Sequence, residues 1–302
     1  MPARAGERYA VLISGVSGAE KYAERQQKWR SELAAFLTTG FAFADANVVT
    51  LDEASQGSTR ATAENVRRLF ADLRRRVTRD DTLLLILLGH GTYDGTDAKF
   101  NLVGPDLNAA EWQQMLDGLP GRLVLVNTTA SSFPFLEKIS RAGRVVITAT
   151  DSPAQRFATM FPEYFIQALA DQSSDADKNG RVSVWEAFAS ASAGVRRHYE
   201  QRGQLTTERP LLDDNGDGVG REAGTPGDDG NVARNVYLDA EPTAPSGDAE
   251  MAALERQRKA LAAQLDDLKT RKASMSEEQY QAELEKILTE LARIAQDIRR
   301  RS

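Results

Sequence analysis

Short apolar runs alternate with longer amphipathic stretches over the first two-thirds of the chain. Apolar runs bounded by polar residues predict strands, and the sequence has at least five of them. They are Tyr9–Ser14, Val48–Leu51, Thr82–Leu88, Leu123–Val126 and Val145–Ala149. Strands that are apolar on both faces and separated by helices are typical of a parallel sheet covered by helices on both sides. The pattern therefore predicts an α/β fold, a three-layer sandwich around a mostly parallel sheet.

Beyond the fifth run the composition changes. Residues from about Asp171 to Asp239 are rich in Asp, Asn and Gly, and a predicted helix from Val184 to about Tyr199 interrupts them. Residues 241–247, Glu-Pro-Thr-Ala-Pro-Ser-Gly, have the composition of a linker. We therefore expect one domain over residues 7–240, with acidic loops within 171–230, followed by a linker and a separate tail.

The tail, residues 248–302, has the pattern of two helices. Leu254, Leu261, Leu265 and Leu268 mark the first, and a second set of apolar residues spaced 4-3-4-3-4 marks a heptad seam. That set is Tyr280, Leu284, Ile287, Leu291, Ile294 and Ile298. Ser276–Gln279 between the helices reads as a capping box, so an antiparallel hairpin is expected. Because a lone hairpin buries little apolar surface, we expect it to dock on the body or to form a homodimer.

The bulk composition excludes several classes of partner. The chain has 302 residues and a net charge of −6, which gives no reason to expect nucleic acid or an anionic membrane. No run approaches the ~20 apolar residues of a membrane span. The first residues contain no apolar core of a signal peptide, so the compartment stays open: a periplasmic or secreted location would fit a chain that begins after a removed signal. Zero cysteine excludes disulfides and thiolate chemistry.

The segment Asp175–Glu186 matches the twelve-residue EF-hand calcium loop position by position. The predicted ligands are the side chains of Asp175, Asp177, Asn179, Ser183 and Glu186 and the carbonyl of Arg181. Ser183 would act directly or through water, and Glu186 would bind through both oxygens. The same residues fit a helix-capping turn, with Ser183 as N-cap and Glu186 three positions later. The two interpretations are compatible because an EF-hand loop also begins a helix.

A second acidic segment, Asp213–Gly220, fits only the first half of such a loop. Its candidate ligands are Asp213, Asn215, Asp217 and Val219. The twelfth position is Gly224, so the bidentate acid is absent unless Glu222 or a later acid such as Asp228 replaces it. The alternative is a solvated loop of Asx turns.

Two further motifs follow neighbouring apolar runs. Gly89-His90-Gly91 comes directly after Thr82–Leu88, and about forty residues later Leu123–Val126 ends in a turn of small residues, Asn127–Ser132. In open α/β sheets ligands bind beyond the carboxyl ends of the strands. Both motifs are therefore expected in one groove, in the layout of a Cys/His hydrolase that has no cysteine.

At these residues the chain resembles the caspase/legumain-type peptidases, the caspase-haemoglobinase fold. Gly89-His90-Gly91 is similar to the histidine motif of that family, and Thr129–Phe133 is similar to its nucleophile motif. The resemblance places the nucleophilic cysteine of the family at Ala130. Ser132 matches a family serine, whereas Phe133 and Pro134 depart from the small residues usual there. The resemblance covers residues 7–240 and leaves the tail outside it.

Three functions follow as hypotheses. The first is a pseudopeptidase that retains His90, binds calcium, and binds a peptide or protein partner without cutting it, because alanine has no nucleophilic atom. The second is a cysteine endopeptidase whose nucleophile has been replaced by Ala130. The third is a hydrolase that uses the hydroxyl of Ser131 or Thr129 with His90 as base. Loss of the nucleophile in such a site costs roughly six orders of magnitude in turnover, which favours the first.

Overall fold

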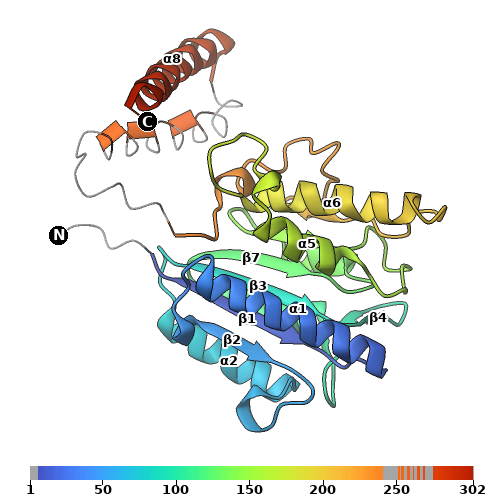
Figure 1. The fold of residues 1–302 in the computed structure, drawn as a ribbon. Helices are drawn as coiled ribbons and strands as arrows, with labels where there is room; N and C mark the ends of the chain where they lie inside the picture. The colour runs from blue at the N-terminus through green and yellow to red at the C-terminus, as the bar shows by residue number, and fades with distance from the viewer. Residues whose placement is uncertain are drawn as a thin grey trace. The chain divides into compact units, whose positions relative to one another are not determined.

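A computed structural model describes residues 6–240 and 275–301, together with single positions and pairs between 251 and 268. The chain divides into two compact units, Met1–Ala240 and Glu241–Ser302 (Figure 1). The segment interpreted as a linker, residues 241–247, lies outside the described residues.

The first unit is built around a six-stranded sheet with the order β2-β1-β3-β7-β8-β9. The strands are β1 (Arg8–Ser14), β2 (Val48–Leu51), β3 (Thr82–Leu88), β7 (Arg122–Asn127), β8 (Val145–Thr148) and β9 (Leu211–Asp213). The first five are parallel, and β9 runs antiparallel to β8. The predicted α/β fold with a mostly parallel sheet is confirmed. The edge strand β9 was not predicted, because three residues are too few to show a period.

Helices cover both faces of this sheet. One face carries α1 (Glu20–Thr39), α5 (Phe161–Ala170) and α6 (Val184–Glu200), and the other carries α2 (Ala63–Arg76), α3 (Ala109–Asp117) and α4 (Phe133–Ile139). The described residues also form the short 3-10 helices η1 (Asp45–Asn47), η2 (Gly57–Thr59), η3 (Gln172–Ser174) and η4 (Ala233–Asn235).

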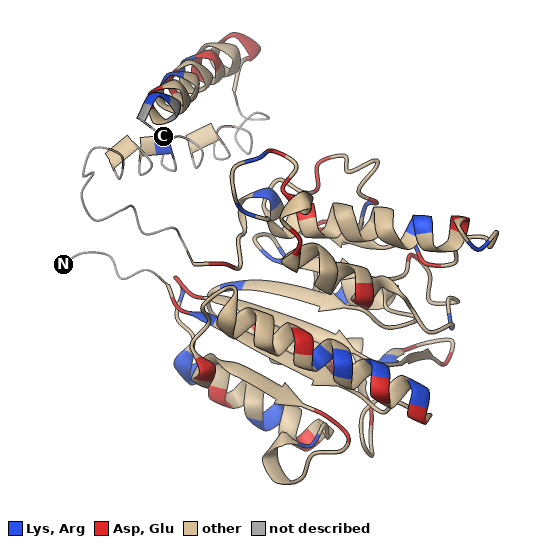
Figure 2. Cartoon of the chain, in the orientation of Figure 1, with Lys and Arg blue, Asp and Glu red and all other residues tan. Residues whose placement is uncertain are grey.

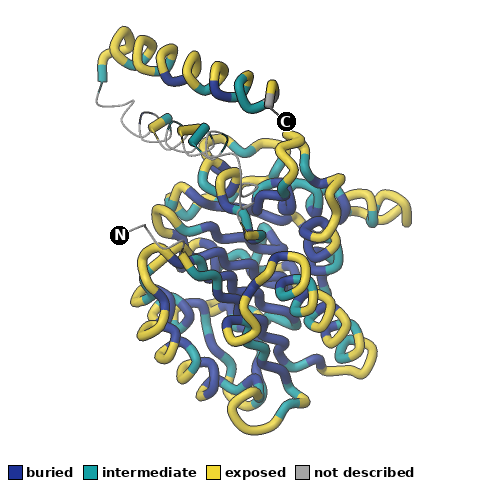
Figure 3. The backbone as a smooth tube through the Cα atoms, turned by 60° about the vertical axis from the view of Figure 1, so that its left-hand side comes forward, coloured by how far each residue is buried: buried dark blue, intermediate teal, exposed yellow. Residues whose placement is uncertain are grey.

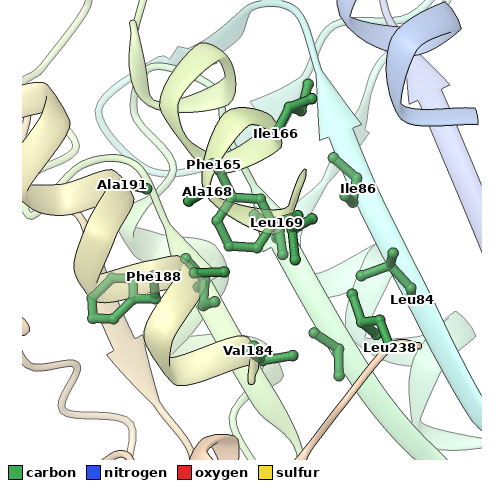
Figure 4. Close-up of a cluster of buried hydrophobic side chains, with 14 of the residues drawn as sticks. Leu84, Ile86, Phe165, Ile166, Ala168, Leu169, Val184, Phe188, Ala191 and Leu238 are labelled. Carbon is green, nitrogen blue, oxygen red and sulfur yellow. The ribbon is translucent and has the colours of Figure 1, made fainter. Parts of the chain in front are cut away.

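Side chains of the central strands point alternately to the two faces of the sheet, so the interior contains two hydrophobic cores. On β3, Leu84 and Ile86 pack toward α5 and α6, whereas Leu83 and Leu85 pack toward α2 and α3. Figure 4 shows the first of these cores, with side chains of α5 and α6 facing β3 and Leu238 beside them. The buried strands lie between exposed loops and helix faces (Figure 3). Residues apolar on both strand faces therefore produce the predicted three layers.

A small antiparallel sheet begins directly after His90. It consists of β4 (Gly91–Tyr93), β5 (Ala98–Phe100) and β6 (Leu107–Asn108), in the order β4-β5-β6. The apolar pattern did not predict it, because each strand is short and only Ala98, Phe100 and Leu107 are buried.

The second unit contains α8 (Glu277–Arg301). Ser276 and Gln279 form the predicted capping contacts, with Gln279 N donating to Ser276 Oγ at 3.3 Å. Ile287 and Ile294 of the heptad seam are 8% and 6% exposed, whereas Leu288 beside the seam is 47% exposed. The first tail helix and the hairpin turn fall mainly outside the described residues. None of the helices described is long and apolar enough to cross a membrane.

Candidate functional site

His90 lies at the carboxyl end of β3, where the chain leaves the main sheet. Its Nε2 is 2.9 Å from the carbonyl oxygen of Ser17, and the ring of Tyr22 packs edge-on against it at 4.9 Å. Because a carbonyl oxygen only accepts hydrogen bonds, Nε2 carries a proton, which leaves Nδ1 as the basic nitrogen of the neutral ring. His90 is thus half-buried and held in a fixed orientation at the edge of the sheet.

The small-residue turn after β7 lies directly against this strand end. A Cβ added to Gly91 would lie 2.3 Å from the carbonyl oxygen of Ala130 and 2.6 Å from Thr129 Oγ1. Only glycine permits so close an approach. The structure therefore packs Gly91, the residue after His90, against the Ala130 turn at the carboxyl edge of the sheet, whereas the His90 side chain contacts Ser17 and Tyr22. The side chain of Ala130 is 2% exposed.

Four hydroxyl groups surround Ala130, and all of them are buried. They belong to Thr128, Thr129, Ser131 and Ser132. Thr129 donates to Asn127 Oδ1 at 2.8 Å, and Ser131, whose φ is +52°, donates to the carbonyl of Pro153 at 2.9 Å. None of the four hydrogen-bonds to His90 among the described contacts. The hydroxyls hydrogen-bond to backbone and side-chain groups in and beside the turn, and the hydroxyl-nucleophile hypothesis stays a prediction.

The first acidic loop gathers three carboxylates. Oxygens of Asp175, Asp177 and Glu186 all lie within 4.8 Å of one another, and no other group of three His, Cys, Asp or Glu residues does so in the described part of the chain. Burial and the nearby charge of Glu186 raise the pKa of Asp177. Clustered carboxylates repel one another, so the arrangement favours a cation between them.

The loop also begins α6, as the capping interpretation predicted. Ser183 Oγ accepts from Glu186 N at 3.2 Å, and Glu186 Oε2 accepts from Ser183 N at 2.9 Å. Glu186 Oε1 accepts from Ala176 N at 2.9 Å, so this carboxylate ties the start of the loop to its end. Ser183 is 1% exposed, and its hydroxyl serves the cap.

The middle of the loop has the compact conformation that such a site requires. Asp175 Oδ2 accepts from Gly180 N at 2.8 Å, and Gly180 has a φ of +87°. Asp177 Oδ1 accepts from Asn179 N at 3.0 Å, and Asn179 Oδ1 accepts from Arg181 N at 2.9 Å. Asp175, Asp177, Asn179 and Glu186, with the Arg181 carbonyl, offer only hard oxygen donors to a metal ion.

A segment that the sequence motif does not include braces this loop. The Arg181 guanidinium binds Asp239 through Nε at 2.7 Å and Nη2 at 2.6 Å, and it lies 4.1 Å from the ring centroid of Tyr237. Asn179 Nδ2 donates to the hydroxyl of Tyr237 at 3.0 Å. No sequence signal links these positions, since 58 residues separate Arg181 from Asp239.

The second acidic loop follows β9 and is closed by two backbone hydrogen bonds between Leu212 and Arg221, at 2.8 and 2.9 Å. Asp213 is 1% exposed, whereas Asn215, Asp217 and Val219 are exposed. The two acids suggested as replacements for the twelfth ligand, Glu222 and Asp228, are exposed as well. The neighbouring Asp229 is instead 1% exposed, and the sequence analysis did not name it.

Both acidic loops lie at the opposite end of the sheet from His90. Asp213 pairs with Val146 near the amino end of β8. The first loop reaches the amino end of β1, because Arg8 binds the carbonyl of Leu238 at 2.6 Å and Asp239 follows it in the chain. Acidic residues gather in the loops near the start of α6 (Figure 2). The acidic loops are therefore separate from His90 and the Ala130 turn, which lie at the carboxyl edge of the sheet.

The second histidine, His198, is part of the packing between helices. Its Nδ1 lies 3.0 Å from the hydroxyl of Tyr164, and the rings of Tyr164 and Tyr199 pack against it at 5.9 and 5.4 Å. Burial lowers the pKa of His198, and the positive charges of Arg202 and Arg25 lower it further.

This lowered pKa gives His198 a defined effect on stability. As the pH falls below the ordinary value of 6.5, the unfolded chain binds the proton first. The stability due to neutral His198 is complete above that pH and is lost as the pH falls through the lowered pKa. We expect the melting temperature of His198→Gln to fall less than that of the wild type between about pH 7 and about pH 5, measured with a chelator. Equal declines would contradict this role.

Comparison with known proteins shows no family for this chain. No family model matches the sequence, and no curated protein matches it. The structure is similar to the crystal structure of a structural-genomics target protein from Geobacter sulfurreducens, with a TM-score of 0.42 and 14% sequence identity. The similarity covers 68% of this chain and 92% of that one.

Proposed function

We propose that this protein binds calcium through the loop Asp175–Glu186 and uses a caspase-like scaffold for binding rather than for hydrolysis. The observation that carries the calcium assignment is the convergence of Asp175, Asp177 and Glu186 within 4.8 Å. Carboxylate, amide and carbonyl oxygens are hard ligands, and calcium takes about six to eight of them. The loop contains no nitrogen or sulfur ligand that would favour a transition metal.

The proposal of a caspase-like scaffold rests on the carboxyl edge of the sheet. His90 follows β3, the Ala130 turn follows its neighbour β7, and Gly91 packs on Ala130. This juxtaposition supports the resemblance to caspase/legumain-type peptidases. Ala130 offers no nucleophile, and the surrounding hydroxyls donate elsewhere. A scaffold of this kind that lacks a nucleophile would bind a peptide or protein segment without cutting it.

The same contact between Gly91 and Ala130 also supports the alternative function, a cysteine endopeptidase whose nucleophile has been replaced by Ala130. A thiol at residue 130 would lie on the turn that packs beside His90, and Nδ1 of that histidine is the nitrogen able to take a proton. The variant Ala130→Cys separates the two functions.

The test combines calcium binding with peptide hydrolysis by the full chain. Calorimetric titration with calcium chloride should show binding by the wild type, and a mixed peptide library should stay uncut with and without calcium. Robust cutting by the wild type would overturn the pseudopeptidase proposal, and absence of calcium binding would overturn the metal assignment. Cutting by a folded Ala130→Cys variant, but not by Ala130→Ser, would favour the replaced-nucleophile alternative.

A homodimer through the tail is proposed on separate grounds. Leu284, Leu288 and Ala292 recur every four residues along α8, and Leu288 is 47% exposed. Together with the heptad seam of α8, this apolar surface is suited to a second helix. Sedimentation of the full chain over a range of concentrations would show whether the protein associates.

A further inference from the structure

The second acidic loop has the same backbone design as the first. In each, an oxygen of the first aspartate accepts from the backbone N–H five residues later: Asp175 from Gly180 at 2.8 Å, and Asp213 from Gly218 at 2.7 Å. The sixth residue is a glycine with positive φ in both, +87° and +75°. The loop after β9 thus has the same backbone conformation as the first acidic loop.

The agreement extends along the loop. Asn215 Oδ1 accepts from Asp217 N at 2.8 Å, as Asp177 accepts from Asn179 in the first loop. Asp217 Oδ1 accepts from Val219 N at 2.7 Å. These bonds place the first, third and fifth ligand positions in the equivalent conformation, but they leave open which acid completes the site.

Asp229 has a buried carboxylate oxygen that is available to complete the second loop. It is 1% exposed, and its Oδ1 accepts from Asp214 N at 3.2 Å, next to the first ligand position. Its Oδ2 is buried and receives no hydrogen bond from the described residues. Burying a carboxylate oxygen without a hydrogen-bond donor costs folding free energy. A bound cation would offset this cost.

The buried negative charge around Asp229 also favours a bound cation. Asp213, Asp214 and Asp229 are each 1% exposed, and none forms an ion pair with a lysine or arginine of the described chain. Asp214 is satisfied by the backbone, because it accepts from Gly230 N at 2.9 Å and from Ala233 N at 2.7 Å. Buried carboxylates are normally paired or bound to metal, and here Asp229 lacks its partner.

We propose that Asp213, Asn215 and Asp217, with Asp229 in place of the missing twelfth ligand, bind a second calcium ion. The carbonyl of Val219 completes the set of oxygens. The carboxylates lie farther apart than those of the first loop, since only the first loop forms a group of three within 4.8 Å in the described residues. Binding must draw them together, so the second site has the lower affinity.

The second site also connects to the first. Asp229 precedes Gly230, where a Cβ would lie 2.5 Å from the ring of Trp185, and the guanidinium of Arg234 lies 4.2 Å from the centroid of that ring. The same segment continues to Tyr237 and Asp239, which brace the first loop. An ion held by Asp229 therefore fixes the start of a segment whose end holds the other loop.

The experiment counts calcium ions bound by the full chain, by equilibrium dialysis against calcium chloride. The wild type should bind two ions, Asp229→Asn one and Glu186→Gln one. Asn at 229 keeps the oxygen that accepts from Asp214 N, so the fold should persist. Asp228→Asn, a change at the exposed neighbour, is the matched control and should bind two.

Each result decides the proposal. A wild type that binds one ion, or an Asp229→Asn variant that still binds two, overturns it. Loss of the ion in Asp228→Asn but not in Asp229→Asn assigns the ligand to Asp228 and also overturns it. If Asp229→Asn fails to fold, Asp217→Ala, at an exposed position, gives the count in its place. Glu186→Gln tests the first site alone, so the loss of binding at the first site is distinguishable from its loss at the second.

Discussion

Calcium should raise the melting temperature of the full chain, and Glu186→Gln should remove most of this rise. An ion that binds only the folded state stabilises it by ~2.7 kcal/mol at a hundredfold excess over its dissociation constant. For a chain of this size that free energy corresponds to a shift of roughly 5–10 °C. Glu186 supplies two of the ligand oxygens in the proposed site, and glutamine supplies one neutral oxygen. Differential scanning calorimetry with calcium and with chelator measures the difference.

The control for this prediction lies on the same helix. Glu200→Gln removes an exposed carboxylate at the other end of α6 and should leave the calcium response intact. Glu186→Gln should melt below the wild type in chelator, because glutamine has one acceptor oxygen and cannot accept from both Ala176 N and Ser183 N. The quantity compared is therefore the calcium-induced rise in each variant. An equal calcium-induced rise in both variants would contradict the assignment of Glu186 as a ligand.

Gly91→Ala should destabilise the protein by ~3 kcal/mol, the upper part of the usual range for overpacking. A Cβ at this position meets the Ala130 carbonyl at 2.3 Å, and a backbone oxygen moves only if the turn itself moves. Buried hydrogen bonds fix the position of this turn; one of them runs from Ser131 N to the Gln155 carbonyl at 2.7 Å. Urea unfolding of the variant and the wild type measures the loss.

Gly224→Ala is the matched control, since a Cβ there meets nothing within 4 Å. It should change the free energy of unfolding by less than about 0.5 kcal/mol. Equal stability of Gly91→Ala and Gly224→Ala would mean that the His90 strand end and the Ala130 turn do not pack as described. The packing on which the proposed caspase-like scaffold rests would then be absent.

The sequence by itself determined the local features of this protein. Residues a few positions apart determine the conformation of the loop from Asp175 to Glu186 and the cap that begins α6. The spacing of these residues in the sequence therefore predicts both features. The apolar runs of β1, β3 and β7 likewise determine a parallel sheet, because strands buried on both faces need helices on both sides. The packing of Gly91, next to His90, on the turn after β7 followed from the rule that parallel strands present their carboxyl ends at one edge.

Tertiary structure alone decided what joins distant segments. Asp229 becomes a candidate ligand only because the chain returns to Asp214, 15 residues away, and Arg181 meets Asp239 across 58 residues. The antiparallel direction of β9 carries the second loop to the amino end of the sheet, away from His90. Such contacts depend on the packing of complete layers and leave no periodic trace in the sequence. The sequence therefore shows which residues have the chemistry, and the fold decides which of them meet.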